Sequence, residues 1–122
     1  MDGKGNINVN APNDMTFTAG KNMNINVGQN MTTSVGMNKS DSIGMNYNES
    51  VGAMKNTTVS GNASMFITGK LTEIIEGDAH SETMKERQEF SKGKTEVSSE
   101  DDIHKNSKTV IKNNSGEKSN FH

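Results

Sequence analysis

An apolar residue returns every eight residues through the middle of the chain, and in the first four of these repeats glycine follows it directly. An α-helix does not accommodate this pattern, because its side chains repeat every 3.6 residues and frequent glycine weakens it. The repeat instead predicts a chain that bends at regular intervals, with one apolar anchor per repeat facing a shared interior. The predicted core anchors are Val27, Val35, Ile43, Val51, Val59, Ile67 and Ile75.

Glycine and asparagine alternate at the points where the chain is expected to turn. An asparagine stands two residues after each of the early glycines, as in Gly28 and Asn30. Glycine reaches positive φ without steric cost, and asparagine tolerates it better than most residues, so these positions are predicted to be corners. After residue 60 the glycine moves one place, to Gly61, Gly69 and Gly77. The predicted corner residues are Gly20, Gly28, Gly36, Gly44, Gly52, Asn22, Asn30, Asn38 and Asn46.

Between the corners, apolar and polar residues alternate. Residues 22–27 read Asn-Met-Asn-Ile-Asn-Val, and residues 7–10 and 15–18 alternate in the same way. A period of two is the period of a β-strand, in which successive side chains point to opposite faces. The sequence therefore predicts an all-β chain of short strands joined by corners.

One eight-residue repeat, here called an octad, supplies only one wall of a closed prism. Two solutions follow: three successive octads form one coil of a monomer, or three chains each supply one wall at every level. Only 29% of the residues are hydrophobic, so a single chain would bury too little surface to offset its ordering entropy. The prediction is an all-β, intertwined triple-stranded β-helix, that is, a trimeric β-prism built from octapeptide repeats.

The octads are not equally regular along the chain. Residues 1–18 are expected to lead into the β-helix, residues 19–79 to form its regular part, and residues 80–122 to continue it less regularly to the tip. From Thr83 onward serine or threonine takes the anchor position, which predicts a more polar core. Within residues 81–92 a helix is the alternative to a further pair of octads.

Methionine occupies a second position of the early octads, at Met15, Met23 and Met31. We interpret these residues as flexible filler of a narrow core. Charged residues and a tyrosine follow in the same position, at Lys39, Tyr47 and Lys55, so the inward assignment is less secure there.

Several classes of function find no support in the residues. Cysteine is absent, which excludes disulfides, zinc–thiolate sites and a thiol nucleophile. The net charge of -2 gives no footprint for nucleic acid. No apolar run is long enough for a membrane span or a signal peptide. No arrangement of nucleophile, acid and base stands out, so we expect no catalytic residue, no cofactor and no enzyme.

The histidines and the main acidic cluster are expected to bind no metal. His80, His104 and His122 stand apart from one another, and we interpret them as surface or wall residues. The acidic run of residues 100–102 is interpreted as a solvated corner.

The octads of residues 27–38, which read Val-Gly-Gln-Asn-Met-Thr-Thr-Ser-Val-Gly-Met-Asn, resemble the C-terminal needle of the type VI secretion spike proteins called VgrG. Those needles are similar in turn to the central spikes of contractile phages. Residues 5–17 are similar to the segment that enters such a needle, and the resemblance covers most of residues 3–79. Some phage spikes bind iron at the tip through a His-x-His pair, which this sequence does not contain.

The resemblance implies a homotrimer at the tip of a contractile injection machine. Such a needle presents a PAAR-type cap and effectors at its C-terminal end, here Ser119, Asn120, Phe121 and His122. It is assembled in the bacterial cytoplasm, then secreted or injected, and contacts the target membrane transiently. In this family the needle follows a larger base, so we expect a needle fragment or a needle-only protein. The alternative function is a phage tail spike or fibre stalk with a binding role.

Overall fold

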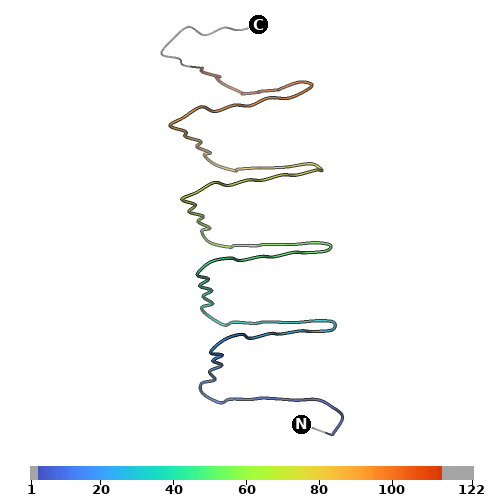
Figure 1. The fold of residues 1–122 in the computed structure, drawn as a ribbon. Coiled ribbons are helices and arrows are strands. Elements are labelled where there is room, and N and C mark those ends of the chain that lie inside the picture. Colours follow the sequence, from blue (N-terminus) through green and yellow to red (C-terminus); the bar gives the residue numbers. More distant parts are fainter. Residues whose placement is uncertain (1–2, 114–122) are drawn as a thin grey trace. The chain divides into compact units, whose positions relative to one another are not determined.

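The computed structural model describes residues 3–113 as extended stretches separated by bends, with no helix and no strand among them (Figure 1). A first bend covers residues 3–5, and from residue 12 onward the bends comprise two residues each and recur every eight residues. The chain divides into two units, Met1–Gly61 and Asn62–His122. In the first unit the bends lie at residues 12–13, 20–21, 28–29, 36–37, 44–45, 52–53 and 60–61. In the second unit they lie at residues 68–69, 76–77, 84–85, 92–93, 100–101 and 108–109.

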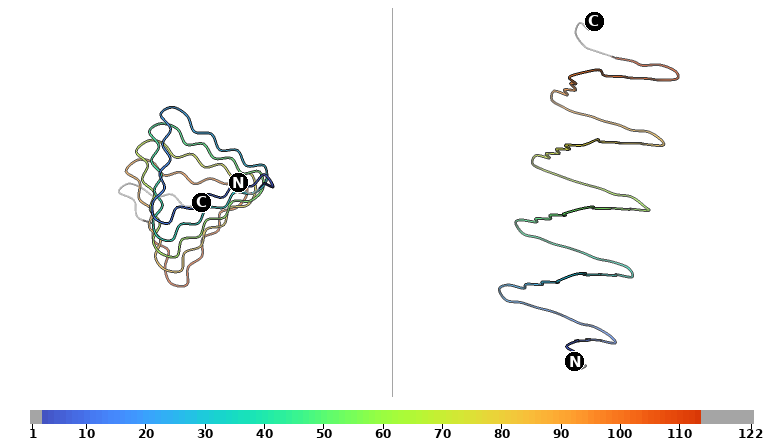
Figure 2. Two further views of the ribbon diagram at one scale, coloured as in Figure 1. Left: turned by 90° about the horizontal axis from the view of Figure 1, so that it is seen from below. Right: turned by 90° about the vertical axis from the view of Figure 1, so that its right-hand side faces the viewer.

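Each unit, taken by itself, winds around a triangular path whose straight sides meet at corners (Figure 2, left). The winding is open. Among the described residues, no two Cα atoms that are twelve or more positions apart in sequence approach within 8 Å. Successive turns of the same unit therefore make no main-chain contact with each other.

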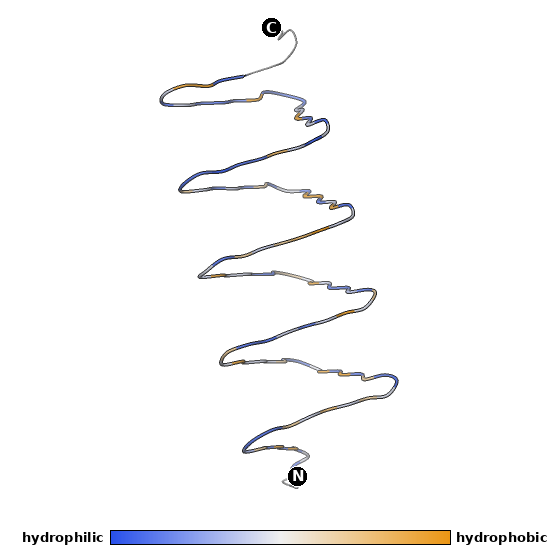
Figure 3. Cartoon of the chain, turned by 90° about the vertical axis from the view of Figure 1, so that its left-hand side faces the viewer, coloured by the Kyte–Doolittle hydropathy of each residue, from blue (hydrophilic) through white to orange (hydrophobic). Residues whose placement is uncertain are grey.

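The part of the chain that the structure describes contains no buried residue, and every described residue is exposed except Ala11, which is partly buried. Short hydrophobic segments are distributed along each unit between hydrophilic ones (Figure 3). A single copy of the chain thus has no core of its own over residues 3–113, and its apolar side chains remain accessible.

Glycine does not create the bends that recur every eight residues by adopting a left-handed backbone. Over residues 3–113 positive φ occurs only at Gly3 and Gly5, near the start of the chain. The prediction that the corners use the positive φ of glycine and asparagine is therefore wrong for the regular octads. The reason is visible at residues 84–85 and 108–109, where the same bend forms without glycine. The change of direction is spread over two residues, neither of which has a positive φ.

The bends continue in phase through the region in which the repeat fades from the sequence. Residues 81–92 carry bends at 84–85 and 92–93 and no helix. Where glycine shifts by one place after residue 60, it moves from the first to the second residue of the bend, as in Gly52 and Gly61, and the bend itself keeps its phase. The spacing of the corners is thus independent of where glycine stands.

Candidate assembly surface

The seven predicted anchors occupy one structural position, directly before a bend. Their exposed fractions fall in a narrow range, from 42% for Ile67 to 52% for Val59. The residues immediately before two of the anchors are much more exposed, at 90% for Phe66 and 83% for Ile74. Since neighbouring residues of an extended stretch point to opposite sides, the anchors face the side toward which the chain turns. We call this the inner side, and the opposite one the outer side.

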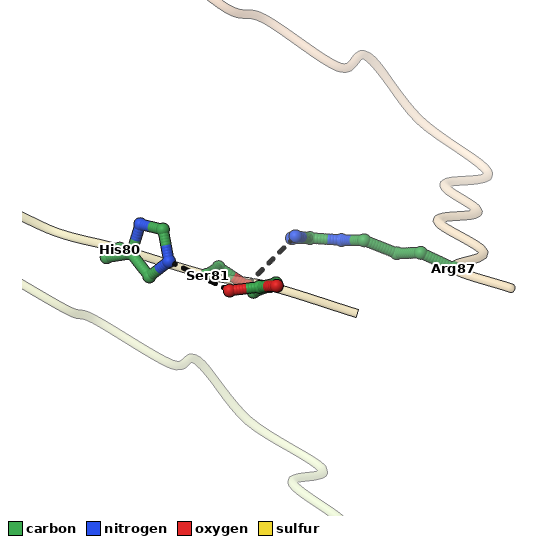
Figure 4. A network of polar contacts seen from close by, with 4 residues as sticks. His80, Ser81 and Arg87 are labelled. Atoms are coloured by element: carbon green, nitrogen blue, oxygen red, sulfur yellow. Dashed lines mark hydrogen bonds and ion pairs between the residues drawn. The ribbon is translucent and has the colours of Figure 1, made fainter. Parts of the chain in front are cut away.

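Two side-chain contacts that span a bend define the inner side independently. Lys55 Nζ lies 3.1 Å from Glu49 Oε2, across the bend at residues 52–53. Arg87 Nη1 donates to Ser81 Oγ at 3.0 Å, across the bend at residues 84–85 (Figure 4). Side chains on both arms of a bend meet in this way when both point into the angle that the arms enclose. These four residues therefore share the inner side with the anchors.

The inner side carries two further ion pairs within single stretches. Lys39 Nζ lies 3.6 Å from Asp41 Oδ2, and Arg87 Nη2 donates to Glu89 Oε1 at 3.0 Å. In each stretch the pair precedes the anchor position by four and two residues, so all three side chains lie on one side. Every partner of these pairs remains substantially exposed in the single chain.

The outer side also carries ion pairs within single stretches. His80 contacts Glu82 at 3.4 Å (Figure 4), Lys94 contacts Glu96 at 3.3 Å, and His104 contacts Asp102 at 3.9 Å. Each of these pairs joins residues two apart in one stretch, and none of the three spans a bend. Exposed pairs of this type contribute little to stability, about 0 to 1 kcal/mol each.

A serine in the anchor position bonds to the backbone of its bend. Thr109 N donates to Ser107 Oγ at 3.3 Å, and Ser107 Oγ donates to the carbonyl oxygen of Val110 at 3.2 Å. A short hydroxyl side chain often supports a turn by bonding to the main chain two residues on. The hydroxyl at this anchor position therefore has partners at the corner itself.

The structure places the other predicted residues as follows. Gly20, Gly28, Gly36, Gly44 and Gly52 are the first residues of their bends, and each predicted asparagine directly follows a bend. An added Cβ at any of these five glycines would meet no atom within 4 Å. The predicted docking end at residues 119–122 lies outside the described residues.

Sequence reasoning missed the charged residues of the inner side as a group. Lys39 and Lys55 stood out only as exceptions in the methionine position. Their acidic partners, Asp41 and Glu49, occupy the next inner position of the octad. These pairs could have been predicted from the sequence, because residues of opposite charge occupy inner positions of the same octad or of neighbouring octads.

Nothing in the described part of the chain resembles a catalytic or metal centre. Residues 3–113 hold no group of three or more His, Asp or Glu side chains arranged to bind a metal, and they line no pocket. Over the same residues there is no helix of the length and apolar character that a membrane crossing requires. The inner side, with an anchor in every octad from Val27 to Ile75 and its charged pairs, is therefore the candidate assembly surface.

Comparison with known proteins gives the family. The family model of the bacteriophage T4 gp5 C-terminal trimerisation domain matches residues 9–99, well over half of the chain. No curated protein and no solved structure matches the chain significantly. The family is a structural trimerisation domain of a spike and not a class of enzyme. The chain therefore belongs to the family of the bacteriophage T4 gp5 C-terminal trimerisation domain.

Proposed function

We propose that three copies of this chain wind into an intertwined triple-stranded β-helix that forms the needle of a contractile injection apparatus. The family is a trimerisation domain with a structural role in a phage spike. The observation that carries the proposal is the unbroken eight-residue spacing of the bends. Seven successive bends, from residues 28–29 to 76–77, are each preceded by a valine or isoleucine on the inner side that a single chain leaves about half exposed. These residues become buried and form a core when other chains cover them.

The open winding of each unit supports three chains and not one. Three octads, 24 residues, complete one turn of a three-walled coil. If two other chains fill the space between turns, successive turns of one chain lie about 14 Å apart, three strand spacings of about 4.8 Å. The single chain makes no Cα approach within 8 Å over such sequence separations, as this arrangement requires. A one-chain solenoid would instead stack its own turns at about 4.8 Å.

In this arrangement the backbone groups of each extended stretch, which have no strand partner within residues 3–113, pair with the neighbouring chains. Inter-strand hydrogen bonds then run nearly parallel to the long axis and resist axial load together. The same pairing leaves no free strand edges along the shaft. A stiff rod of this kind suits a part that is driven through an envelope.

The finer assignment follows from the octads of residues 27–38. We propose a spike of the type VI secretion kind, assembled in the bacterial cytoplasm and driven through a target envelope. The C-terminal end, residues 119–122, would receive a PAAR-type cap with its effectors. Pull-down of a PAAR-type protein by the trimer, lost when residues 119–122 are deleted, tests this part.

The core of the proposal predicts trimeric, stable β-structure in solution. Analytical ultracentrifugation should give three times the chain mass of 13.2 kDa, and circular dichroism should show β-structure that persists in SDS. A monomer with a helical or unstructured spectrum would contradict both the fold and the injection role.

A second candidate, a tail fibre stalk that binds a receptor, is favoured by one observation. Phe66, Ile74 and Phe90 lie on the outer side at matching octad positions, and their exposed fractions are 90%, 83% and 89%. In a triple-stranded helix Phe66 of one chain would lie beside Ile74 of the next, which gives an apolar patch on each wall. Binding of the trimer on a glycan array, lost on substitution of Phe66 by serine, would support this candidate.

A further inference from the structure

The anchors alone do not determine how three chains align. The regular anchors are all valine or isoleucine, they recur every eight residues, and each precedes a bend. If one chain slips by one octad relative to the other two, each of its anchor positions is filled by the anchor of the neighbouring octad. That anchor is again valine or isoleucine, so the packing of the core changes little. Repeats of this kind specify their register weakly unless something breaks the degeneracy.

Charged side chains on the inner side make the octads different from one another. They occur at unique places: Lys39 with Asp41, Glu49 with Lys55 across a bend, and Arg87 with Glu89 and Ser81. Between the last two groups the corresponding inner positions hold apolar residues at Ala63, Met65 and Leu71, with Glu73 the exception. The three paired groups, together with the further inner-side charges Glu73 and Lys105, thus mark particular octads of an otherwise repetitive interior.

From these positions we infer that the charged inner-side pairs set the register of the three chains. The inference rests on the proposed trimeric β-helix, in which three copies of each octad meet at one level. When the chains are aligned, Lys39 meets Asp41 at its own level, and Glu49 meets Lys55 at the adjacent level. When one chain slips by an octad, its Lys55, still paired with Glu49 of the same chain, enters the level of its neighbours' Ala63 and Met65. The slipped pair then lies apart from the matching pairs of the other two chains and beside apolar side chains. Taking charged groups into an apolar surrounding is unfavourable, while buried polar groups that are paired specify alignment.

The geometry of three intertwined chains makes the register measurable. An octad of one chain has, as its neighbour on the same wall, the following octad of the next chain. Aligned copies of one outer residue, such as Asn24, therefore lie on three different walls. A slip by one octad moves the chain to the next wall, where its residue 24 stacks on residue 24 of another chain at about 4.8 Å. This spacing lies within the range of about 4.4 to 6.8 Å that joins the Cα atoms of a disulfide.

Because the chain contains no cysteine, introduced thiols give an unambiguous readout. The single variant Asn24→Cys reports slippage, since oxidation links two chains only when one has slipped. The double variant Asn24→Cys with Thr32→Cys reports alignment, since residue 24 of one chain then lies beside residue 32 of the next. In the native background we expect no linked product from the single variant and a covalent trimer from the double variant.

The test removes the paired charged residues of the inner side, leaves Glu73 and Lys105 in place, and keeps the octads. The substitutions take residues that the chain itself uses at equivalent positions, and they are Lys39→Met, Asp41→Thr, Glu49→Thr, Lys55→Met, Arg87→Thr and Glu89→Val. In this background the single thiol at residue 24 should give disulfide-linked dimer at a level roughly tenfold or more above the native background, because slipped trimers lose their penalty. Sedimentation of the same variant checks that it is still a trimer.

A matched control removes an ion pair from the outer side. Lys94→Met with Glu96→Thr deletes a pair of similar length, 3.3 Å, that faces away from the anchors. We expect this control to behave as the native background does. Aligned chains in the six-fold variant, shown by trimer cross-linking of the double thiol without any linkage of the single thiol, would overturn the inference. Failure of the double thiol to cross-link in the native background would instead overturn the proposed trimer itself.

Discussion

Two adjacent isoleucines differ in the side of the chain that they face. Ile75 is an anchor on the inner side with an exposed fraction of 50%, whereas Ile74 lies on the outer side with an exposed fraction of 83%. Each of the two isoleucines stands between the other isoleucine and a glutamate, and they differ by one position in their distance from the bend at residues 76–77. Any difference between their substitutions therefore reports on the environment that assembly creates.

We expect Ile75→Ala to destabilise the trimer and Ile74→Ala to leave it nearly unchanged. Removing a buried isoleucine costs about 2 to 5 kcal/mol per copy, and each trimer contains three copies. Exposed substitutions usually stay within about 0.5 kcal/mol of the parent protein. Denaturant unfolding followed by circular dichroism measures both. Equal losses for the two variants would mean that the inner side is not the core.

At the level of the bend, spacing matters more than the residue type. Glycine is not required by its φ at the octad corners, and an added Cβ at Gly44 meets no atom within 4 Å. A change of spacing has a larger effect, because a shift by one residue turns every later side chain of an extended stretch to the opposite side. The anchors beyond the shift would then face outward.

Insertions at the bend of residues 44–45 test this difference. One asparagine added between Gly44 and Met45 should abolish the trimer or leave only the preceding octads folded. A duplicate of residues 45–52 inserted at the same point adds a whole octad and should keep the trimer. Gly44→Ala should change the free energy of unfolding by no more than about 1 kcal/mol per chain. Sedimentation and limited proteolysis distinguish these outcomes, and tolerance of the single insertion would contradict the octad design.

Sequence alone gave the phase of the bends at this level but not their conformation. The anchor series from Val27 to Ile75 locates each corner, because hydrophobic periodicity follows from the need for a shared interior. The backbone conformation at the corner was not predictable from glycine, since many φ and ψ combinations turn a chain. The inner charged pairs were equally hidden, because Glu49 and Lys55 become neighbours only once the bend between them is known. The tip and its docking residues stay a prediction.

For the molecule as a whole, folding and assembly must be the same event. Residues 3–113 of one copy bury no side chain and make no long-range main-chain contact, so a single copy has nothing to offset the entropy of ordering. Obligate oligomers often have no stable folded monomer, and their apparent stability then depends on concentration. The contribution of the hydrophobic effect then appears in the equilibrium between three free chains and one trimer.

The midpoint of thermal unfolding should therefore rise with protein concentration. Because three chains become one particle, each tenfold dilution removes two factors of ten from the equilibrium, about 2.7 kcal/mol per trimer. Thermal scans by circular dichroism over a hundredfold range of concentration measure the shift. The oxidised double variant Asn24→Cys with Thr32→Cys is the control, since covalent linkage makes unfolding unimolecular and its midpoint should not move. A concentration-independent midpoint in the unlinked chain would mean that one copy folds alone, as a solenoid whose successive turns are in contact.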